Sequence, residues 1–534
     1  MCGIFGYIGK ETSLALLIEG LSRLEYRGYD SCGLTAIRGG KFFLKKQQGK
    51  IYQLKSNVKG CLQESFRACI LHTRWATHGR PSRANAHPHL DCNKQIAIVH
   101  NGIIENYLVL KERLCKEGHR FLSDTDTEVI VHLIEKFYKG NLEEAVCKAI
   151  KHLKGAFALG VISFREPDKL IGVRKGSPLI VGKGVQGNFI ASDVPAILSF
   201  TRRVMYLRDE EIAVVRRDRI DVLNFKGEAI KHETEEVRVK QQDVEKGGYE
   251  HFMLKEIFEQ PHILEKMLSL YCRETGIVLP QLNFTENFSK KIKKIYITAC
   301  GTAYHAGLVG KYFLEKYCYI NSEIDVSSEF RYRKMHLTKD DLLIAISQSG
   351  ETADTLAAVR EAKKQGAKIL SVCNVLGSSL VKESQGLLYT FAGPEIGVAS
   401  TKAYTAQILS LYLFALLLGT QKGVLRDRAS REAVKELKAI PAYQRDVLEK
   451  ASQVKRIAKR FSKFGCFLFL GRGINYPSAL EGALKLKEIS YIPAEGYPGG
   501  EMKHGPIALI DEYRGVVCIA PKDNLHEKMV SNMP

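Results

Sequence analysis

The chain has 534 residues, more than one domain usually holds, which predicts three or more domains. Hydrophobic residues make up 45% and charged residues 26%, as in globular proteins, and no apolar run approaches the roughly 18 residues that span a bilayer. The net charge of +20 is spread over segments that also carry Glu and Asp, which favours small anionic ligands over nucleic acid or a membrane.

The cysteine pattern and the first residues bear on location and metal content. The 13 cysteines form no C-x2-C or C-x4-C pair, so we expect neither disulfides nor structural zinc, and no metal site. The first ten residues contain no secretory signal, which predicts a cytoplasmic location.

Residues 1–240 predict an α+β domain. Apolar or alternating runs predict strands at residues 3–8, 68–76, 95–104, 156–164 and 212–223. Apolar spacings of three and four predict helices at 13–26 and 126–138, and residues 124–126 offer capping oxygens to the second helix.

From about residue 291 the pattern becomes strand, tight turn, helix, which predicts a doubly wound α/β fold. An internal repeat at an offset of 172 predicts two similar units. The pairs are Gly301 and Gly473, Tyr304 and Tyr476, and Leu308 and Leu480. The strand at 342–346 corresponds to 516–520, after which the chain soon ends, so we expect the second unit to lack two or three strands.

Cys2 becomes the first residue if Met1 is removed. Its free α-amino group, with a pKa of about 7.7–8.0, can then accept the thiol proton through one water. Such a thiol suits attack on an amide. The alternative is that a cysteine stands at this position by chance.

Two strand ends carry groups suited to a polar ligand. The segment 72–79 places the Arg74 guanidinium, a hydroxyl and an imidazole together, where a carboxylate can bind; the alternative is a surface ion pair. Asn101 with the Gly102 N–H can form an oxyanion hole; the alternative is a hairpin turn.

The motifs at 2–6, 24–31, 72–79, 100–106 and 123–128 resemble a class II glutamine amidotransferase domain. The resemblance implies an N-terminal-nucleophile hydrolase fold, an αββα sandwich, in which Cys2 attacks the side-chain amide of glutamine. It also implies that Asn101 and Gly102 hold the oxyanion.

The same resemblance assigns the glutamine contacts. Arg74, with Thr77 and His78, would bind the α-carboxylate, and Asp126 would pair with the α-ammonium. Trp75, the only tryptophan, would help to close the site toward an ammonia path; the alternative is a core aromatic, and one side chain can serve both roles.

In the second half, the turn at 347–352 brings hydroxyls and backbone N–H groups to a helix start, which favours a phosphate; the alternative is a simple N-cap. Lys485 and Glu488 share one helix face, as a functional or a surface pair. His504 follows on a glycine-rich loop and can titrate near neutral pH.

The segments 296–333, 343–356, 393–406 and 480–510 resemble sugar isomerase domains. The resemblance implies that Glu488 moves a proton between C1 and C2 of the sugar with Lys485 beside it, as a carbonyl isomerisation requires. His504, from a neighbouring subunit, would open the sugar ring, which implies a homodimer. The phosphate ligands would be Thr302, Ser347, Gln348, Ser349 and Thr352.

Taken whole, the chain resembles the isomerising glutamine:fructose-6-phosphate aminotransferases, which need no cofactor and make glucosamine 6-phosphate at the start of amino-sugar synthesis. The expected domains are a glutaminase at 1–240, a linker and helical lead-in at 241–290, and sugar isomerase domains at 291–425 and 455–534, the second incomplete. The family's C-terminal tail supplies a lysine with no match here, so we expect glutamine hydrolysis to survive better than sugar synthesis.

Two other functions stay open. Another class II amidotransferase, such as one serving asparagine or phosphoribosylamine synthesis, predicts a nucleotide or pyrophosphate site. A truncated chain could retain only glutaminase activity or sugar-phosphate binding.

Overall fold

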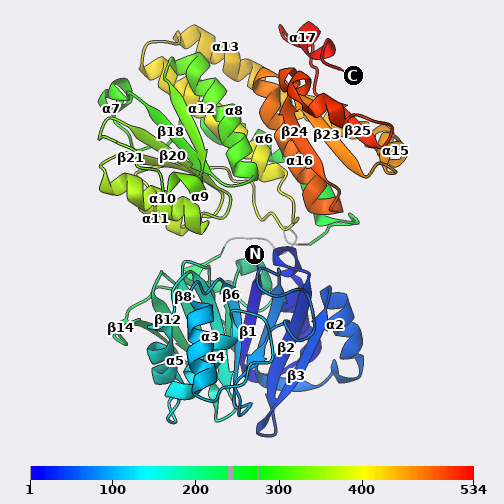
Figure 1. Ribbon diagram of the computed structural model, residues 1–534. Helices are drawn as coiled ribbons and strands as arrows, with labels where there is room; N and C mark the ends of the chain where they lie inside the picture. The colour runs from blue at the N-terminus through cyan, green and yellow to red at the C-terminus, as the bar shows by residue number, and fades with distance from the viewer. Residues whose placement is uncertain (1, 238–244, 275, 534) are drawn as a thin grey trace. The chain divides into compact units, whose positions relative to one another are not determined.

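The computed structural model describes residues 2–237, 245–274 and 276–533. The chain divides into two compact units, Met1–Glu245 (unit 1) and Lys246–Pro534 (unit 2) (Figure 1). The predicted boundary between residues 240 and 241 lies outside the described residues.

Unit 1 contains two large sheets. The first is eight-stranded, in the order β15-β11-β9-β10-β1-β4-β2-β3, and the second is seven-stranded, in the order β14-β13-β12-β8-β7-β6-β5. The strands of the first sheet are β1 (Gly3–Ser13), β2 (Ser31–Arg38), β3 (Lys41–Gln48), β4 (Ser65–Arg74), β9 (Ile180–Lys183), β10 (Gly187–Ala191), β11 (Arg203–Tyr206) and β15 (Glu235–Glu236). Those of the second are β5 (His89–Leu90), β6 (Ile96–Gly102), β7 (Phe157–Ser163), β8 (Glu166–Lys175), β12 (Glu211–Val215), β13 (Ile220–Asn224) and β14 (Ala229–Ile230).

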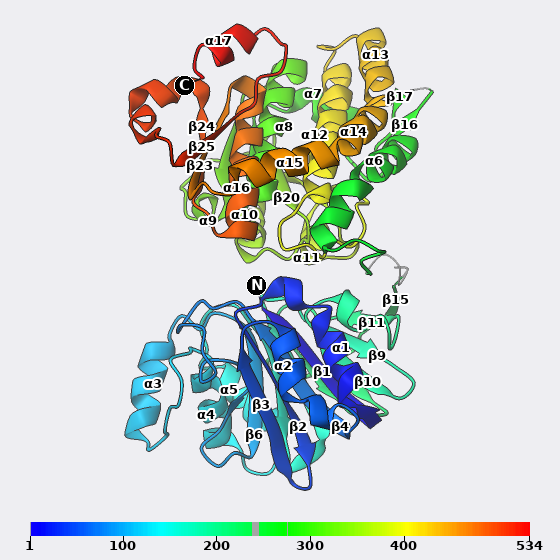
Figure 2. The ribbon, with the colours of Figure 1, turned by 90° about the vertical axis from the view of Figure 1, so that its right-hand side faces the viewer.

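The sheets pack face to face between two helical layers (Figures 1 and 2). Alternation along β1 puts Ile4 in the cluster between the sheets and Phe5 in the cluster under the outer helices. The helices α1 (Leu14–Ser22) and α2 (Ile51–Asn57) cover the eight-stranded sheet. The helices α3 (Tyr107–Lys116), α4 (Glu128–Phe137) and α5 (Leu142–Ile150) cover the seven-stranded sheet.

Three local predictions in unit 1 were wrong. The strand expected at 212–223 is the hairpin β12–β13, because the charged residues 216–219 form a turn closed by Arg216 N–H and Arg219 C=O. The helix expected at 13–26 ends at Ser22 and is followed by a separate 3₁₀ turn, Glu25–Arg27. No side chain caps α4, since the Asp126 carboxylate instead accepts the backbone N–H of Ile104, 2.8 Å away.

Unit 2 begins with α6 (Phe252–Tyr271), the short hairpin β16 (Cys272–Arg273) and β17 (Gly276–Ile277), and α7 (Glu286–Lys291). A parallel five-stranded sheet follows, in the order β19-β18-β20-β21-β22. Its strands are β18 (Ile295–Ala299), β19 (Ser322–Val326), β20 (Leu342–Ser347), β21 (Lys368–Cys373) and β22 (Gly386–Tyr389). Its helices are α8 (Thr302–Cys318), α9 (Ser327–Phe330), α10 (Ala353–Lys364), α11 (Ser379–Glu383) and α12 (Lys402–Gln421).

The rest of unit 2 carries a parallel three-stranded sheet in the order β24-β23-β25. Its elements are α13 (Asp427–Leu437), α14 (Ile440–Glu449), α15 (Ala451–Phe461), β23 (Cys466–Gly471), α16 (Tyr476–Ser490), β24 (Ala494–Pro498), the 3₁₀ helices η6 (Gly499–His504) and η7 (Pro506–Leu509), β25 (Arg514–Cys518) and α17 (His526–Val530). In both sheets of unit 2 the first strand lies between the second and the third, so β25 occupies the place of β20. The internal repeat had predicted that β20 and β25 correspond, but the sequence analysis had predicted neither β19 nor β24.

Within the described residues, one helix, α12, is long and apolar enough to cross a membrane by length and composition alone. Of its most apolar stretch, 67% is buried inside the molecule, where Leu411 and Phe414 are at most 1% exposed. This helix therefore has the burial of a core helix.

Candidate functional site

Cys2 lies directly before β1, the central strand that pairs with β10 and β4. The backbone N–H of Trp75 donates to Cys2 Sγ over 3.2 Å. The carbonyl oxygen of Cys2 accepts from Arg27 Nε at 3.1 Å and from Asn101 Nδ2 at 3.0 Å. Burial raises the pKa of the Cys2 thiol, and the Trp75 hydrogen bond with the charges of Arg74 and Arg27 offsets only part of that. The thiol therefore needs a base to become a thiolate.

Asn101 and Gly102 are the last two residues of β6, so the hairpin-turn alternative is wrong. Asn101 Nδ2 also donates to Ser192 Oγ at 2.8 Å, and Asn101 Oδ1 lies 3.0 Å from His72 Nε2. Gly102 has φ +124°, and a Cβ there would lie 2.0 Å from the carbonyl oxygen of Ala156, so only glycine fits.

Arg74 ends β4 and is only 4% exposed, which excludes the surface ion pair. Its Nη2 donates to the carbonyl oxygens of His78 and Gly79. Its Nη1 is buried and has no hydrogen-bond partner among the described residues. Burial lowers the pKa of Arg74, and Cys2, when it is a thiolate, and the carboxylates of Asp126 and Asp30 oppose that shift. A buried guanidinium with an unused donor is suited to an incoming carboxylate.

The residues after Arg74 leave the sheet. Trp75 is 37% exposed and meets Tyr29 edge-on, with ring centroids 5.4 Å apart, so the core-aromatic alternative is wrong. Thr77 is exposed. His78 packs edge-on against Tyr107, and its Nδ1 is buried without a hydrogen-bond partner among the described residues.

A cluster of four buried histidines supports Asn101 and was missed from sequence: His72, His87, His89 and His100. His87 Nδ1 lies 3.2 Å from His72 Nε2, the same nitrogen that contacts Asn101. Burial lowers the pKa of His72 to about 3 and those of His87 and His89 well below the ordinary value. The cluster is therefore neutral at physiological pH. The high density of histidines between residues 72 and 100 could have predicted this cluster from the sequence.

In unit 2, two predicted turns meet at one sheet edge. The parallel neighbours β18 and β20 end at Ala299 and Ser347, and Thr302 begins the helix after the first. In a sheet of this order, ligands bind where the connections from neighbouring strands diverge, which here is between β18 and β20.

The turn after β20 is held by its own hydroxyls. Ser347 Oγ lies 3.0 Å from Thr352 Oγ1 and accepts the N–H of Gly350. Ser349 Oγ accepts the N–H of Glu351, and the half-buried Gln348 lies between these serines. Thr352 occupies the N-cap position of α10 without a side-chain capping bond, so the simple N-cap alternative is wrong.

Thr302 is drawn toward α16 rather than toward the serine turn. Its hydroxyl donates to Glu481 Oε1 and accepts from Lys485 Nζ, each over 2.9 Å. Lys485 Nζ is also 2.7 Å from Glu488 Oε2, and the lysine side chain is 15% exposed. The predicted pair is therefore tied into the interface of α8 and α16 instead of lying free on the surface.

Glu481, at the centre of this network, was missed from sequence. It is 6% exposed, and its Oε2 lies 2.7 Å from His305 Nδ1. Burial raises the pKa of this carboxyl, but the partners His305, Lys485 and Thr302 outweigh burial and lower it. Its spacing of four from Lys485 was the available signal. His504 ends η6 as an exposed residue, and no described contact joins it to Lys485 or Glu488.

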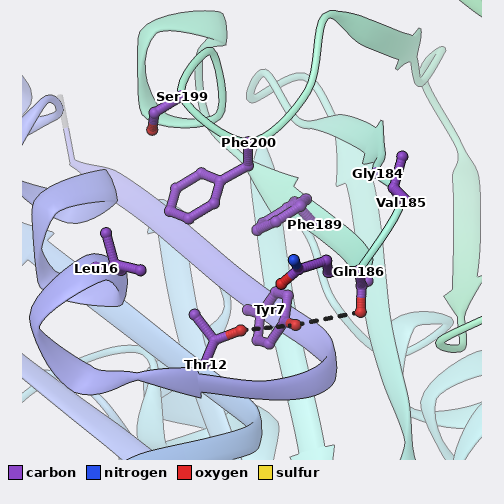
Figure 3. Close-up of a pocket in the computed structure, with 10 residues that line it drawn as sticks. Tyr7, Thr12, Leu16, Gly184, Val185, Gln186, Phe189, Ser199 and Phe200 are labelled. Atoms are coloured by element: carbon purple, nitrogen blue, oxygen red, sulfur yellow. Dashed lines mark hydrogen bonds between the residues drawn. The ribbon is translucent and has the colours of Figure 1, made fainter. Parts of the chain in front are cut away.

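A cavity of about 310 Å³ in unit 1 is lined by Tyr7, Thr12, Phe189 and Phe200 among others (Figure 3). The Tyr7 hydroxyl accepts from Thr12 Oγ1 at 2.9 Å and donates to the carbonyl oxygen of Lys10 at 2.7 Å, while the carbonyl oxygen of Gln186 lies 3.4 Å away. None of the sequence-predicted site residues lines this cavity, so it has no part in the site.

Family models match three parts of the chain. A glutamine amidotransferase domain matches residues 72–199, and the SIS domain, the sugar isomerase module, matches residues 289–417 and 465–532. The C-terminal domain of glucosamine-fructose-6-phosphate aminotransferase from Francisella tularensis is 45% identical, with a TM-score of 0.52, and the match covers 54% of this chain and 81% of that one.

Full-length relatives match as well. Proteins named glutamine–fructose-6-phosphate aminotransferase (isomerizing) from Clostridium acetobutylicum and Thermotoga maritima are 49% and 47% identical, over 100% of this chain and 88% of each relative. The relatives do not support the prediction that the chain is truncated, and the incompleteness of the second sugar isomerase domain stays a prediction. Because both the glutamine amidotransferase and the SIS modules are matched and the similarity runs through the whole chain, it belongs to the glutamine–fructose-6-phosphate aminotransferase (isomerizing) family.

Proposed function

We propose that this chain transfers the amide nitrogen of glutamine to fructose 6-phosphate, giving glutamate and glucosamine 6-phosphate. The observation that carries the proposal is the pairing of sites in one chain. Unit 1 holds a thiol 3.2 Å from a backbone N–H beside a buried guanidinium with an unused donor. Unit 2 holds a Lys485–Glu488 pair bonded to Thr302 at the start of α8. The alternatives of another amidotransferase or of glutaminase activity alone are not favoured by the relatives' names.

In unit 1, once Met1 has been removed, the Cys2 thiol passes its proton to the free α-amino group of Cys2, and the thiolate attacks the amide carbon of glutamine. The amide C–N bond breaks, ammonia leaves with that proton, and water hydrolyses the resulting thioester to glutamate. Asn101 Nδ2 and the Gly102 N–H stabilise the oxyanion; the amide must then turn from the Cys2 carbonyl oxygen that it contacts at 3.0 Å.

The substrate's polar ends are matched by opposite charges in unit 1. Arg74 Nη1 donates to the α-carboxylate with help from Thr77 and His78, and Asp126 accepts from the α-ammonium. Trp75 covers the bound substrate, which its exposed indole allows.

In unit 2, the hydroxyls and N–H groups after β18 and β20 bind the sugar phosphate through Thr302, Ser347, Gln348, Ser349 and Thr352. Ammonia adds to the C2 carbonyl of the open-chain sugar and water leaves, which gives an imine. Glu488 then carries a proton from C1 to C2, which converts the imine to the amine and C1 to the aldehyde, because a carboxylate beside this centre is a suitable base. Lys485, with Nζ 2.7 Å from Glu488 Oε2, holds the Glu488 carboxylate in place until substrate arrives. His504 opens the sugar ring.

We also propose a cytoplasmic homodimer in which His504 serves the site of the second copy. The support is that His504 is exposed and no described contact joins it to Lys485 or Glu488. Mixing Glu488→Gln and His504→Asn chains tests this: shared sites restore part of the activity in mixed dimers, whereas separate sites restore none.

The reaction itself is tested by incubating the chain with glutamine and fructose 6-phosphate and measuring glutamate and glucosamine 6-phosphate in one sample. Equal amounts of both products support the proposal. Glutamate without amino sugar would leave only a glutaminase, and neither product would contradict the proposal for both units.

A further inference from the structure

Four side chains with metal-binding atoms converge in unit 1 outside the proposed glutamine site: Cys92, His119, His132 and Glu135. Their ligand atoms all lie within 4.8 Å of one another. We propose that this cluster binds one zinc ion with four protein ligands, a structural site that the proposed transferase function does not require.

The spacing of the four ligand atoms is close to that of a zinc site. A tetrahedron with zinc bonds of about 2.0–2.3 Å has ligand–ligand edges of about 3.3–3.8 Å. Cys92 Sγ is 3.8 Å from His119 Nδ1 and 3.6 Å from His132 Nδ1. Glu135 Oε2 is 2.9 Å from His119 Nδ1 and 3.3 Å from His132 Nδ1. The other two edges of the tetrahedron are no longer than 4.8 Å, so zinc needs shifts of at most about 1 Å to draw the four atoms into its geometry.

The backbone fixes the two ligands that lie on loops. Asp91 Oδ1 accepts the N–H groups of Gln95 and Ile96, which closes the turn that carries Cys92. Gly118 (φ +96°) follows the end of α3, and the N–H of His119 donates to the carbonyl oxygen of Leu114. Local hydrogen bonds therefore fix the positions of Cys92 and His119, which do not depend on the contact between the two side chains.

The groups that contact the four ligands also fit a metal. Asn93 holds Glu135 Oε1 through Nδ2 at 2.8 Å, which leaves Oε2 for the ion. The N–H of Arg120 donates to Cys92 Sγ at 3.4 Å, as expected for a ligating thiolate. His132 Nε2 faces Glu128 Oε1 at 3.8 Å, so Nδ1 can bind metal while Nε2–H points at a carboxylate.

The ligand types select the metal. One thiolate, two imidazoles and one carboxylate suit zinc, whereas magnesium and calcium prefer oxygen ligands alone. Binding releases the thiol proton to solvent, and four protein ligands leave no open position for catalysis. The ligands run from residue 92 to residue 135 without a short motif, so spacing in the sequence did not reveal them.

The proposed site joins the loop of Cys92, the loop of His119 and helix α4, and it is connected by hydrogen bonds to the segment that precedes Asp126. Glu128, beside His132, accepts the N–H groups of Leu122 and Ser123 at 2.8 and 2.7 Å. The segment that these bonds hold leads directly to Asp126. A metal on α4 would therefore stiffen the loop that carries a proposed glutamine contact.

The test removes metal from the full chain with a chelator, adds one equivalent of zinc or cobalt(II), and measures bound metal after gel filtration. We expect about one ion per chain and, with cobalt, a thiolate charge-transfer band with tetrahedral d–d bands. Cys92→Ser and His119→Gln should each weaken zinc binding at least ~10-fold. Cys115→Ser, at an exposed thiol outside the cluster, is the matched control and should bind as the parent does.

Zinc should also raise the melting temperature of the parent and the control but not that of Cys92→Ser. Equal zinc content in parent and Cys92→Ser, or a parent that binds none, would overturn the proposal and leave a plain hydrogen-bonded cluster. His119→Gln keeps a donor for Glu135, so a folded variant that still fails to bind zinc separates ligation from folding.

Discussion

The two units hold their candidate reactive groups by different physical means. In unit 1, Asn101 is oriented by neutral groups, with His72 at 3.0 Å and Ser192 at 2.8 Å, inside a core that keeps the imidazoles uncharged. In unit 2, Glu488 is oriented by charge, through Lys485, which also contacts Glu481. A neutral network positions the oxyanion donor without competing for the substrate's charges, whereas a charged network positions a carboxylate base through an ion pair that is sensitive to salt.

The largest expected effect separates the chemistry of the two units. Cys2→Ala should lower glutamine hydrolysis at least ~10⁴-fold, because no other group replaces the nucleophile. Glutamate release by Cys2→Ala is the measurement. The control is Cys115→Ala, which removes an exposed thiol on α3. Substantial hydrolysis by Cys2→Ala would place the nucleophile elsewhere.

The next effect concerns the charged network. Glu488→Gln should lower amino-sugar formation ~10³-fold while glutamine hydrolysis stays within about twofold, because only the proton carrier is lost. The control is Glu449→Gln, an exposed glutamate at the end of α14. Both activities should be measured in one sample, and equal losses of the two would mean that Glu488 acts structurally.

A smaller effect tests Arg74 Nη1, a donor in unit 1 that has no hydrogen-bond partner among the described residues. Arg74→Lys keeps the charge but loses the guanidinium fork, so kcat/KM for glutamine should fall ~10²-fold, chiefly through KM. Arg80→Lys, an exposed neighbour, should have no effect. An unchanged KM for Arg74→Lys would remove Arg74 from carboxylate binding.

The smallest expected effect is the pH dependence of stability, which has opposite signs in the two units. Burial raises the pKa of Glu256 in unit 2 to about 7, so the folded chain holds this proton more tightly than the unfolded chain does. Stability of unit 2 should therefore fall by roughly 2 kcal/mol as pH rises from about 4.5 to 7, and Glu256→Gln should remove that fall. Unit 1 behaves oppositely: with the pKa of His72 at about 3, it loses stability as pH falls below about 6.5.

Thermal unfolding measured from pH 5 to pH 8 gives the change of stability with pH for each unit. Glu449→Gln is the control for Glu256→Gln. A unit 2 transition that gains stability over this range would contradict the role given to Glu256.

Much of the site follows from local sequence, because strand ends and tight turns are set by nearby residues. The positions of Arg74 at the end of β4 and of Ser347 at the end of β20 were predicted from apolar runs followed by polar turns. The correspondence of β25 with β20 was likewise readable from the repeat. Short strands such as β19 and β24 gave no such signal, since their residues are polar or only partly buried.

The sequence alone determined which chemical groups are present, where the main strands end, and which family the motifs resemble, because those features depend on residue identity and short-range pattern. Only the tertiary structure decided which groups meet. It brought Glu481 to Thr302 across 179 residues, packed four histidines behind Asn101, and gathered Cys92 with His132. Such contacts depend on how whole elements pack, and the burial that sets the pKa values of Glu256 and His72 exists only once the core has formed.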